Sequence, residues 1–222
     1  MDPITSAALY AAGRDRILAA ARDFSPAELD RAVPACPDWT VHDLLAHLTG
    51  VATDFVQGNL DGAPFPPWTD RQVAPRRQLP ASAVLAEWSA SSVLLEQLIT
   101  SGTTSHPLVC NPYADASVHE ADLRGAVGIP RPPREAYLAT VEWMLDGAAS
   151  GVAVHTPDGT YWLESDGPAA EVPVDSYELF RAVFGRRSAA QIRSWAWSSP
   201  EAAAVWSTEL PMLPQTAVDL VD

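Results

Sequence analysis

An aspartate, a histidine and a second aspartate recur along one face of a predicted helix. Asp115 and His119 are four residues apart, so their side chains meet on one helical surface. On a wheel drawn at about 100° per residue, Asp122 lies beside them, on the face that also carries Leu123 and Ala126. Carboxylates and imidazoles are costly to bury unless they are paired or bind a metal, so this face is a candidate ligand surface.

The opposite side of this helix is expected to face solvent. Glu120 and Arg124 form an (i, i+4) pair of opposite charge, which is typical of an exposed helical surface.

Another histidine lies at the edge of a second apolar helical face. Residues 36–50 read "CPDWTVHDLLAHLTG". Apolar residues recur at helical spacing here, at Val41, Leu44, Leu45, Leu48, Val51, Ala52 and Phe55. His47 falls at the edge of this stripe, whereas His42 falls on the back of the helix.

Together, His47, Asp115 and His119 offer two nitrogens and one oxygen inside a helical bundle. That set suits zinc with a fourth position left open for catalysis. Iron, nickel or another divalent ion would also accept it. Asp122, one turn beyond His119, is placed to orient an imidazole from outside the ligand set.

Each of these residues also has an ordinary structural explanation. A single histidine on the flank of a helix, such as His47, is more often a partly buried polar residue than a ligand. Asp115 lies in a first helical turn, where negative charge is favoured. Asp122 could instead pair with an arginine of a neighbouring helix, Arg14, Arg16 or Arg22. The coincidence of the Asp-x-x-x-His spacing with the buried face favours the metal hypothesis.

The elements that must position these residues form a helical bundle followed by a small α+β unit. Periodicity and capping residues predict helices over residues 5–23, between Thr40 and Gly58, over 81–100, between Asn111 and Gly128, and over 134–148. A proline-rich connection over 59–80 is expected to be irregular, either a lid or a surface crossover.

The pattern changes after Gly151. "VAVHTPDGTYWLE" predicts two strands around a turn, "AEVPV" a third strand, and "SYELFRAVFG" and "SAAQIRSWAW" two short helices. We therefore predict two domains, a helical bundle over 1–149 and an α+β domain over 150–222.

Composition narrows the classes of function. The net charge of −14 argues against nucleic acids and anionic membranes as partners. The chain has neither an apolar run of about 18 residues nor a signal-peptide pattern, which favours a soluble, cytoplasmic protein. Phosphate-binding, dinucleotide-binding, nucleophile-elbow and His-Glu-x-x-His motifs are missing from the sequence. We expect a monomer or homodimer that binds small molecules.

Three blocks of the sequence resemble a known family. "VPACPDWTVHDLLAHLTG" resembles the signature of the mycothiol-dependent maleylpyruvate isomerase family, in which Cys-Pro-x-Trp-Thr-Val precedes Leu-Leu-x-His-Leu. "DASVHEADLRGAVGIPRPP" resembles its second block, and "YELFRAVFGRRSAAQIRSW" its C-terminal domain. The family belongs to the DinB-like metal-binding superfamily, so the resemblance implies a mainly α protein with a DinB-like four-helix bundle.

The resemblance also implies site residues and cofactors. His47 and His119 match the first and third metal ligands, and Asp115 stands where the family often has glutamate, which has a longer reach. The family's metal is usually zinc, and its members use a low-molecular-weight thiol, here expected to be mycothiol. Arg186 and Arg187 fall in the region expected to bind substrate and help close the site.

The resulting hypothesis is a metal-dependent thiol transferase or cis-trans isomerase that acts on a small electrophilic substrate through a metal-bound thiolate. Metal coordination deprotonates a thiol, and the thiolate then attacks an electrophilic carbon. Addition to a cis double bond followed by elimination would give isomerisation, whereas a stable adduct would give transfer. Two alternatives remain: a metal-dependent hydrolase built from the same residues, and a non-catalytic binding bundle with a degenerate metal site.

Overall fold

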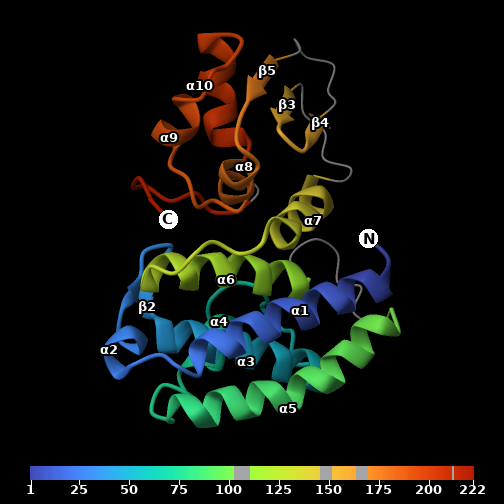
Figure 1. The fold of residues 1–222 in the computed structure, drawn as a ribbon, viewed down its shortest axis with the longest axis vertical. Helices are drawn as coiled ribbons and strands as arrows, with labels where there is room; N and C mark the ends of the chain where they lie inside the picture. The colour runs from blue at the N-terminus through green and yellow to red at the C-terminus, as the bar shows by residue number, and fades with distance from the viewer. Residues whose placement is uncertain (103–110, 146–151, 164–169, 212) are drawn as a thin grey trace. The chain divides into compact units, whose positions relative to one another are not determined.

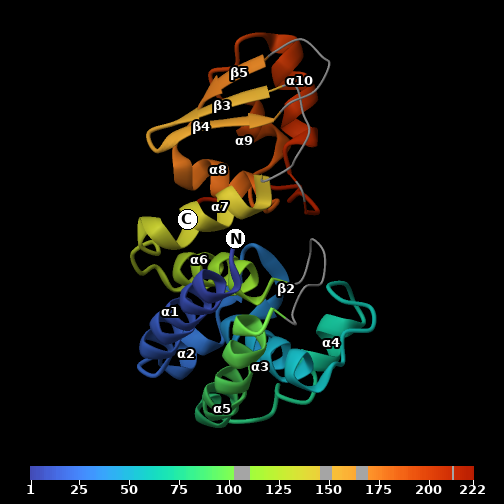
Figure 2. The ribbon, with the colours of Figure 1, turned by 90° about the vertical axis from the view of Figure 1, so that its right-hand side faces the viewer.

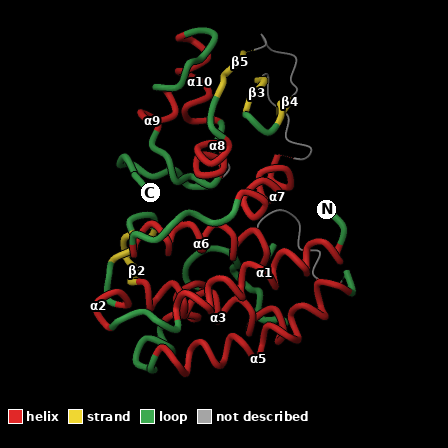
Figure 3. The backbone as a smooth tube through the Cα atoms, viewed as in Figure 1, coloured by secondary structure: helices red, strands yellow, loops and turns green. Residues whose placement is uncertain are grey.

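The computed structural model describes residues 1–102, 111–145, 152–163, 170–211 and 213–222. They divide into two compact units, Met1–Pro132 with Asp222, and Pro133–Val221. Helices predominate among the described residues, with short strands in both units (Figure 3).

Four long helices form the bundle in the described part of the first unit. They are α1 (Pro3–Ala21), α3 (Val41–Gln57), α5 (Ala81–Thr100) and α6 (Pro112–Val127). Helix α1 packs against α5 and α6, and α3 packs against the same two helices, which closes the bundle (Figure 1). The shorter elements are α2 (Pro26–Leu29), α4 (Trp68–Val73), β1 (Ala32–Val33) and β2 (Cys36–Thr40).

Local sequence signals explain where α3 and α6 begin and end. Thr40 and Asp43 form a reciprocal capping box at the start of α3, and Asn111 caps α6 by accepting from the backbone N–H of Tyr113. Gly58 and Gly128 end the two helices in the left-handed conformation, at φ 75° in both cases. These caps match the predicted ones.

The apolar stripe of α3 is buried as predicted, with exposed fractions from 0 to 7% at Val41, Leu44, Leu45, Leu48, Val51, Ala52 and Phe55. His47 is buried too, at 3%. The connection over 59–80 is less irregular than expected, because it contains α4, which packs against α3.

The prediction that Glu120 on α6 faces solvent is wrong. This carboxylate is fully buried, at 0% exposed. Arg16 on α1 donates to both of its oxygens, at 2.9 Å from Nε to Oε1 and 2.7 Å from Nη2 to Oε2, and Arg124 donates to Oε1 at 3.0 Å. A countercharge from a neighbouring helix makes the burial possible.

The second unit contains α7 (Arg134–Leu145), a three-stranded sheet, and the helices α8 (Ser176–Val183), α9 (Ala189–Arg193) and α10 (Pro200–Glu209). Strand β3 (Val152–Thr156) lies between β4 (Gly159–Leu163) and β5 (Ala170–Pro173), antiparallel to β4 and parallel to β5 (Figure 2). The hairpin turn between β3 and β4 is the predicted Pro-Asp-Gly turn, with Thr156 opposite Gly159.

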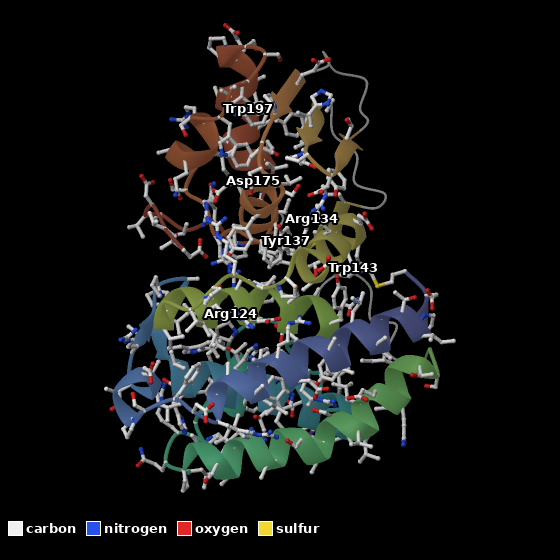
Figure 4. The ribbon with its side chains drawn as sticks, in the orientation of Figure 1. Arg124, Arg134, Tyr137, Trp143, Asp175 and Trp197 are labelled. Carbon is white, nitrogen blue, oxygen red and sulfur yellow. The ribbon has the colours of Figure 1, made fainter. Side chains whose placement is uncertain are left out.

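The two units divide after Pro132, whereas the sequence analysis placed the domain boundary after residue 149. Helix α7 therefore belongs to the second unit. Tyr137, which is labelled in Figure 4, belongs to α7. Its ring stacks on Phe180 of α8, with centroids 5.7 Å apart, and meets Tyr177 edge-on at 5.3 Å. This aromatic cluster gives α7 a core to pack on within its own unit.

Among the helices in the described ranges, none combines the length and the apolar character that crossing a membrane requires.

Candidate metal centre

The structure brings the three predicted ligands together where α3 packs against α6. Asp115 Oδ1 lies 3.5 Å from His47 Nε2 and 3.5 Å from His119 Nε2. The two imidazole rings meet edge-on, with centroids 5.0 Å apart. One ligand atom from each residue falls within 4.8 Å of the other two.

These separations fit a tetrahedral metal. Ligand atoms that each lie about 2.0–2.2 Å from a tetrahedral zinc ion are about 3.3–3.6 Å from one another. Both contacts of Asp115 have this length, so its shorter side chain still reaches a position shared with the two imidazoles. Each histidine is nearly buried, whereas the Asp115 side chain is 26% exposed. The accessible side of the cluster is therefore the side of Asp115.

The outer nitrogen of each imidazole has an acceptor as its partner. His119 Nδ1 lies 3.0 Å from Asp122 Oδ2, and His47 Nδ1 lies 2.7 Å from Gln72 Oε1. A carboxylate and an amide oxygen both accept, so we assign the proton of each neutral ring to Nδ1. The lone pairs on both Nε2 atoms then face the Asp115 carboxylate. Three acceptors directed at one position are favourable when a cation occupies it.

Asp122 lies where the sequence analysis expected an orienting residue, bonded to His119 and 2% exposed. Two of the three arginines considered as alternative partners of Asp122 form ion pairs with other residues, Arg14 with Glu96 and Arg16 with Glu120.

A second group of candidate ligands overlaps the first. Ligand atoms of Cys36, His119 and Asp122 also lie within 4.8 Å of one another. In this group, however, the His119 and Asp122 atoms already face each other at 3.0 Å through Nδ1 and Oδ2. The group of His47, Asp115 and His119 is the better candidate, because its two Nε2 atoms are directed at a shared carboxylate oxygen.

Several residues at the site were not predicted. The Trp39 ring lies 4.8 Å from the His47 ring and 6.1 Å from that of His119, and Trp68 meets His47 edge-on at 6.3 Å. These indoles surround the imidazoles with apolar surface. Trp39 belongs to the Cys-Pro-x-Trp motif and Trp68 to the proline-rich connection expected to be a lid or a surface crossover, so both carried a sequence signal.

Gln72 carried no such signal. It comes from α4 and reaches His47 because α4 lies very close to α3 at Gly50. A Cβ atom added at Gly50 would fall 2.4 Å from Gln72 Cβ, which is closer than non-bonded carbons approach. Glycine at this position therefore allows the His47–Gln72 hydrogen bond.

Two ion pairs hold the chain after α4 in place. Arg77 donates to Asp43 at 2.9 Å from Nε to Oδ1, and Arg76 pairs with Glu87 on α5. Burial raises the pKa of Asp43, but hydrogen bonds from Arg77 and from the backbone of Thr40 outweigh it and lower the pKa below its ordinary value. The pKa of Glu87 is lowered in the same way, with Arg76 outweighing burial.

The two arginines predicted to bind substrate lie in the second unit. Arg187 is 2% exposed, and its Nε and Nη2 donate to the Glu178 carboxylate at 2.6 and 2.9 Å. Arg186 Nη1 donates to the backbone oxygen of Phe184 at 2.7 Å. Their role in binding substrate stays a prediction.

Comparisons with known proteins bear on the family and the fold of this chain. Residues 10–124, a little over half of the chain, match the family described as the mycothiol maleylpyruvate isomerase N-terminal domain. A crystal structure of the mycothiol-dependent maleylpyruvate isomerase matches with a TM-score of 0.54 at 15% identity, covering 84% of this chain and 90% of that chain. A histidine-to-alanine mutant of the mycothiol-dependent maleylpyruvate isomerase matches with a TM-score of 0.55 at 14% identity, covering 89% of this chain and 93% of that chain.

No curated protein matches the chain. At these identities the structural likeness establishes the fold, so the predicted fold class, a mainly α DinB-like bundle followed by a small α+β unit, is confirmed.

Proposed function

Because the chain belongs to the mycothiol maleylpyruvate isomerase N-terminal domain family, we propose that it is a metal-dependent thiol transferase or cis-trans isomerase. Its substrate would be a small electrophile, and its cofactor mycothiol or a similar low-molecular-weight thiol. The observation that carries this proposal is the position of Asp115 Oδ1, 3.5 Å from Nε2 of both His47 and His119.

The donor set suits a divalent ion, and zinc fits it best. Two imidazole nitrogens and one carboxylate oxygen leave a fourth tetrahedral position for an exogenous group. When bound, such a cation would lower the pKa of a thiol in that position, so that the thiol reacts as a thiolate near neutral pH.

The side chains around the cluster have distinct tasks in this proposal. Asp122 and Gln72 hold the two imidazoles in fixed orientations through their Nδ1 atoms. Trp39 and Trp68 cover the rings and keep water away from them. The partly exposed side at Asp115 is the route by which thiol and electrophile would enter. The thiol supplies the nucleophile, so no nucleophilic side chain is required.

The experiment compares the metal content and thiol consumption of wild type with those of His47→Ala and His42→Ala. Both histidines are on α3, but His42 Nε2 lies 3.0 Å from the backbone oxygen of Leu79. Wild type and His42→Ala should each bind one divalent ion and consume thiol in the presence of a soft electrophile. His47→Ala should lose both properties.

Other outcomes would favour the alternatives. Turnover at the same rate without thiol would indicate a metal-dependent hydrolase. A wild-type protein that stays metal-free at micromolar zinc and nickel would indicate a non-catalytic bundle. Equal losses from both variants would mean that the assignment of ligands is wrong.

A further inference from the structure

Three polar side chains form a hydrogen-bonded chain behind His47. Gln72 Nε2 donates to Asp54 Oδ2 at 2.8 Å, and Gln72 Oε1 lies 2.7 Å from His47 Nδ1. Gln72 is 1% exposed and His47 3% exposed, so solvent has little access to the bond between them. Asp54 lies on α3, seven residues after His47, and Gln72 comes across from α4.

This chain has a fixed direction. A carboxylate only accepts hydrogen bonds, so the amide group that faces Asp54 must be the NH₂ of Gln72. The amide oxygen must then face His47, and an oxygen in that position requires a donor at Nδ1. A neutral imidazole has a single N–H, so Nε2 is left with its lone pair. Asp54 thereby acts on the imidazole of His47 through the Gln72 amide.

We propose that Asp54 and Gln72 are positioning residues that select the Nδ1–H tautomer of His47 and keep its Nε2 available to a divalent cation. The link to a cation rests on the proposed function, whereas the tautomer does not. The two histidines of the cluster differ in this respect: Asp122 accepts directly from His119, but the carboxylate that orients His47 acts through an amide.

The packing of α4 supports this role. Gly50 permits Gln72 to approach α3 closely, and Arg76 Nη1 donates to the backbone oxygen of Gln72 at 2.8 Å. Contacts to the side chain and to the backbone of Gln72 therefore both hold its amide in place. A group that orients another side chain needs such a fixed position.

The test is Asp54→Asn, which leaves His47, Gln72 and the ligands intact. An asparagine at position 54 can donate as well as accept, so the Gln72 amide can turn over and donate to His47 Nδ1. The proton of the imidazole then moves to Nε2, where it blocks a metal. The matched control is Asp70→Asn, which removes the same charge from an exposed position on α4.

Two measurements are made on full-length protein. Nitrogen-15 NMR of the metal-free protein at about pH 8.5, where ordinary histidines are neutral, reports the tautomer of His47. Competitive titration reports zinc affinity. Asp54→Asn should populate the Nε2–H tautomer and bind zinc about 10- to 100-fold more weakly, the usual effect of losing an outer partner. Asp70→Asn should match wild type in both measurements.

Gln72→Met provides a second variant, because it keeps the length of the side chain and removes both hydrogen bonds. It should also lose the preference for Nδ1–H. An unchanged tautomer and zinc affinity in Asp54→Asn would overturn the proposal, and so would a loss of affinity with an unchanged tautomer. If wild type binds no zinc but Asp54→Asn shifts the tautomer, the positioning role stands, and the cation and the proposed function fail.

Discussion

At the scale of single residues, the length of the Asp115 side chain decides how the proposed ligands meet. A glutamate would place its carboxylate about one bond, ~1.5 Å, farther along. Since Asp115 Oδ1 already lies 3.5 Å from both Nε2 atoms, α6 is placed for the shorter residue.

We therefore predict that Asp115→Glu crowds the site and weakens zinc binding. Asp115→Asn keeps the shape, removes the charge and should weaken binding as well. Competitive zinc titration of the three proteins measures both effects. Tighter binding by the glutamate variant would show that α6 is set for a longer ligand, and equal affinities would show that Asp115 does not bind the metal.

The residues of the candidate site were predictable to different degrees. His47 could be found because α3 carries a clear apolar stripe, and Asp115, His119 and Asp122 because they recur at helical spacing on α6. Gln72 could not be found, because its contact with His47 depends on how a short helix after a proline-rich segment packs on α3. That placement depends on tertiary packing, which helical periodicity does not describe.

At the scale of elements, the approach of α4 to α3 at Gly50 supports the cluster. We predict that Gly50→Ala costs about 1–3 kcal/mol of unfolding free energy, as overpacking usually does, and weakens zinc binding by displacing Gln72. Urea denaturation and zinc titration measure the two effects.

Gly13→Ala is the matched control, because Gly13 also lies inside a helix but its added Cβ would meet only Arg16 Nη2, at 3.6 Å. Alanine is favoured over glycine in helices by up to about 1 kcal/mol, so this variant should be as stable as wild type or more stable. A Gly50→Ala protein with unchanged stability and affinity would contradict the close packing of α4.

The ion pair between Asp43 and Arg77 connects the start of α3 to the segment after α4, and it makes stability depend on pH. The pKa of Asp43 is lowered in the folded protein, so its contribution is present above the ordinary pKa of about 3.9 and is lost as pH falls through the folded value. Asp43→Asn should lower the unfolding free energy by roughly 1 kcal/mol at neutral pH. The loss combines a weaker capping box with the loss of an ion pair that contributes little, because Arg77 is half exposed.

The measurement is urea denaturation of both proteins between neutral pH and pH 3. The difference between them should begin to shrink below about pH 4, where Asp43 becomes protonated in the unfolded protein, and it should vanish only below the lowered pKa of the folded protein. Asp61→Asn, at an exposed position, should show no such pH-dependent difference. A constant difference across the range would mean that the charge of Asp43 contributes nothing.

The buried Glu120 shows a limit of reasoning from one helix. Its (i, i+4) pairing with Arg124 was predicted and is present, at 2.9 Å from Nη2 to Oε1. The Glu120 carboxylate is nevertheless buried, because Arg16 of α1 adds a second cation to it, whereas Arg124 stays partly exposed. The sequence of α6 contains no information about the residue that α1 presents to it.

At the scale of the whole molecule, the order of elements was predictable and the boundary between units was not. Five long helical segments and three strands follow the expected order, because each carries its own periodicity or turn signal in the described residues. The assignment of α7 depends on the contacts of Tyr137 with Tyr177 and Phe180, which lie about 40 residues later in the chain. The expected cytoplasmic location and the expected oligomeric state, monomer or homodimer, stay predictions.

The division into two units predicts where metal binding resides. The three proposed ligands and their orienting partners, Asp54, Gln72 and Asp122, all fall within residues 1–132. A fragment of residues 1–132 should therefore fold, as judged by circular dichroism, and bind zinc with an affinity close to that of the full chain. Zinc at about 100-fold above its dissociation constant should add about 2.7 kcal/mol to the unfolding free energy of this fragment.

The control is a fragment of residues 133–222, whose melting temperature should not respond to zinc at the same concentration. A folded 1–132 fragment that no longer binds zinc would place part of the site outside the first unit, because the loss could not then be ascribed to unfolding.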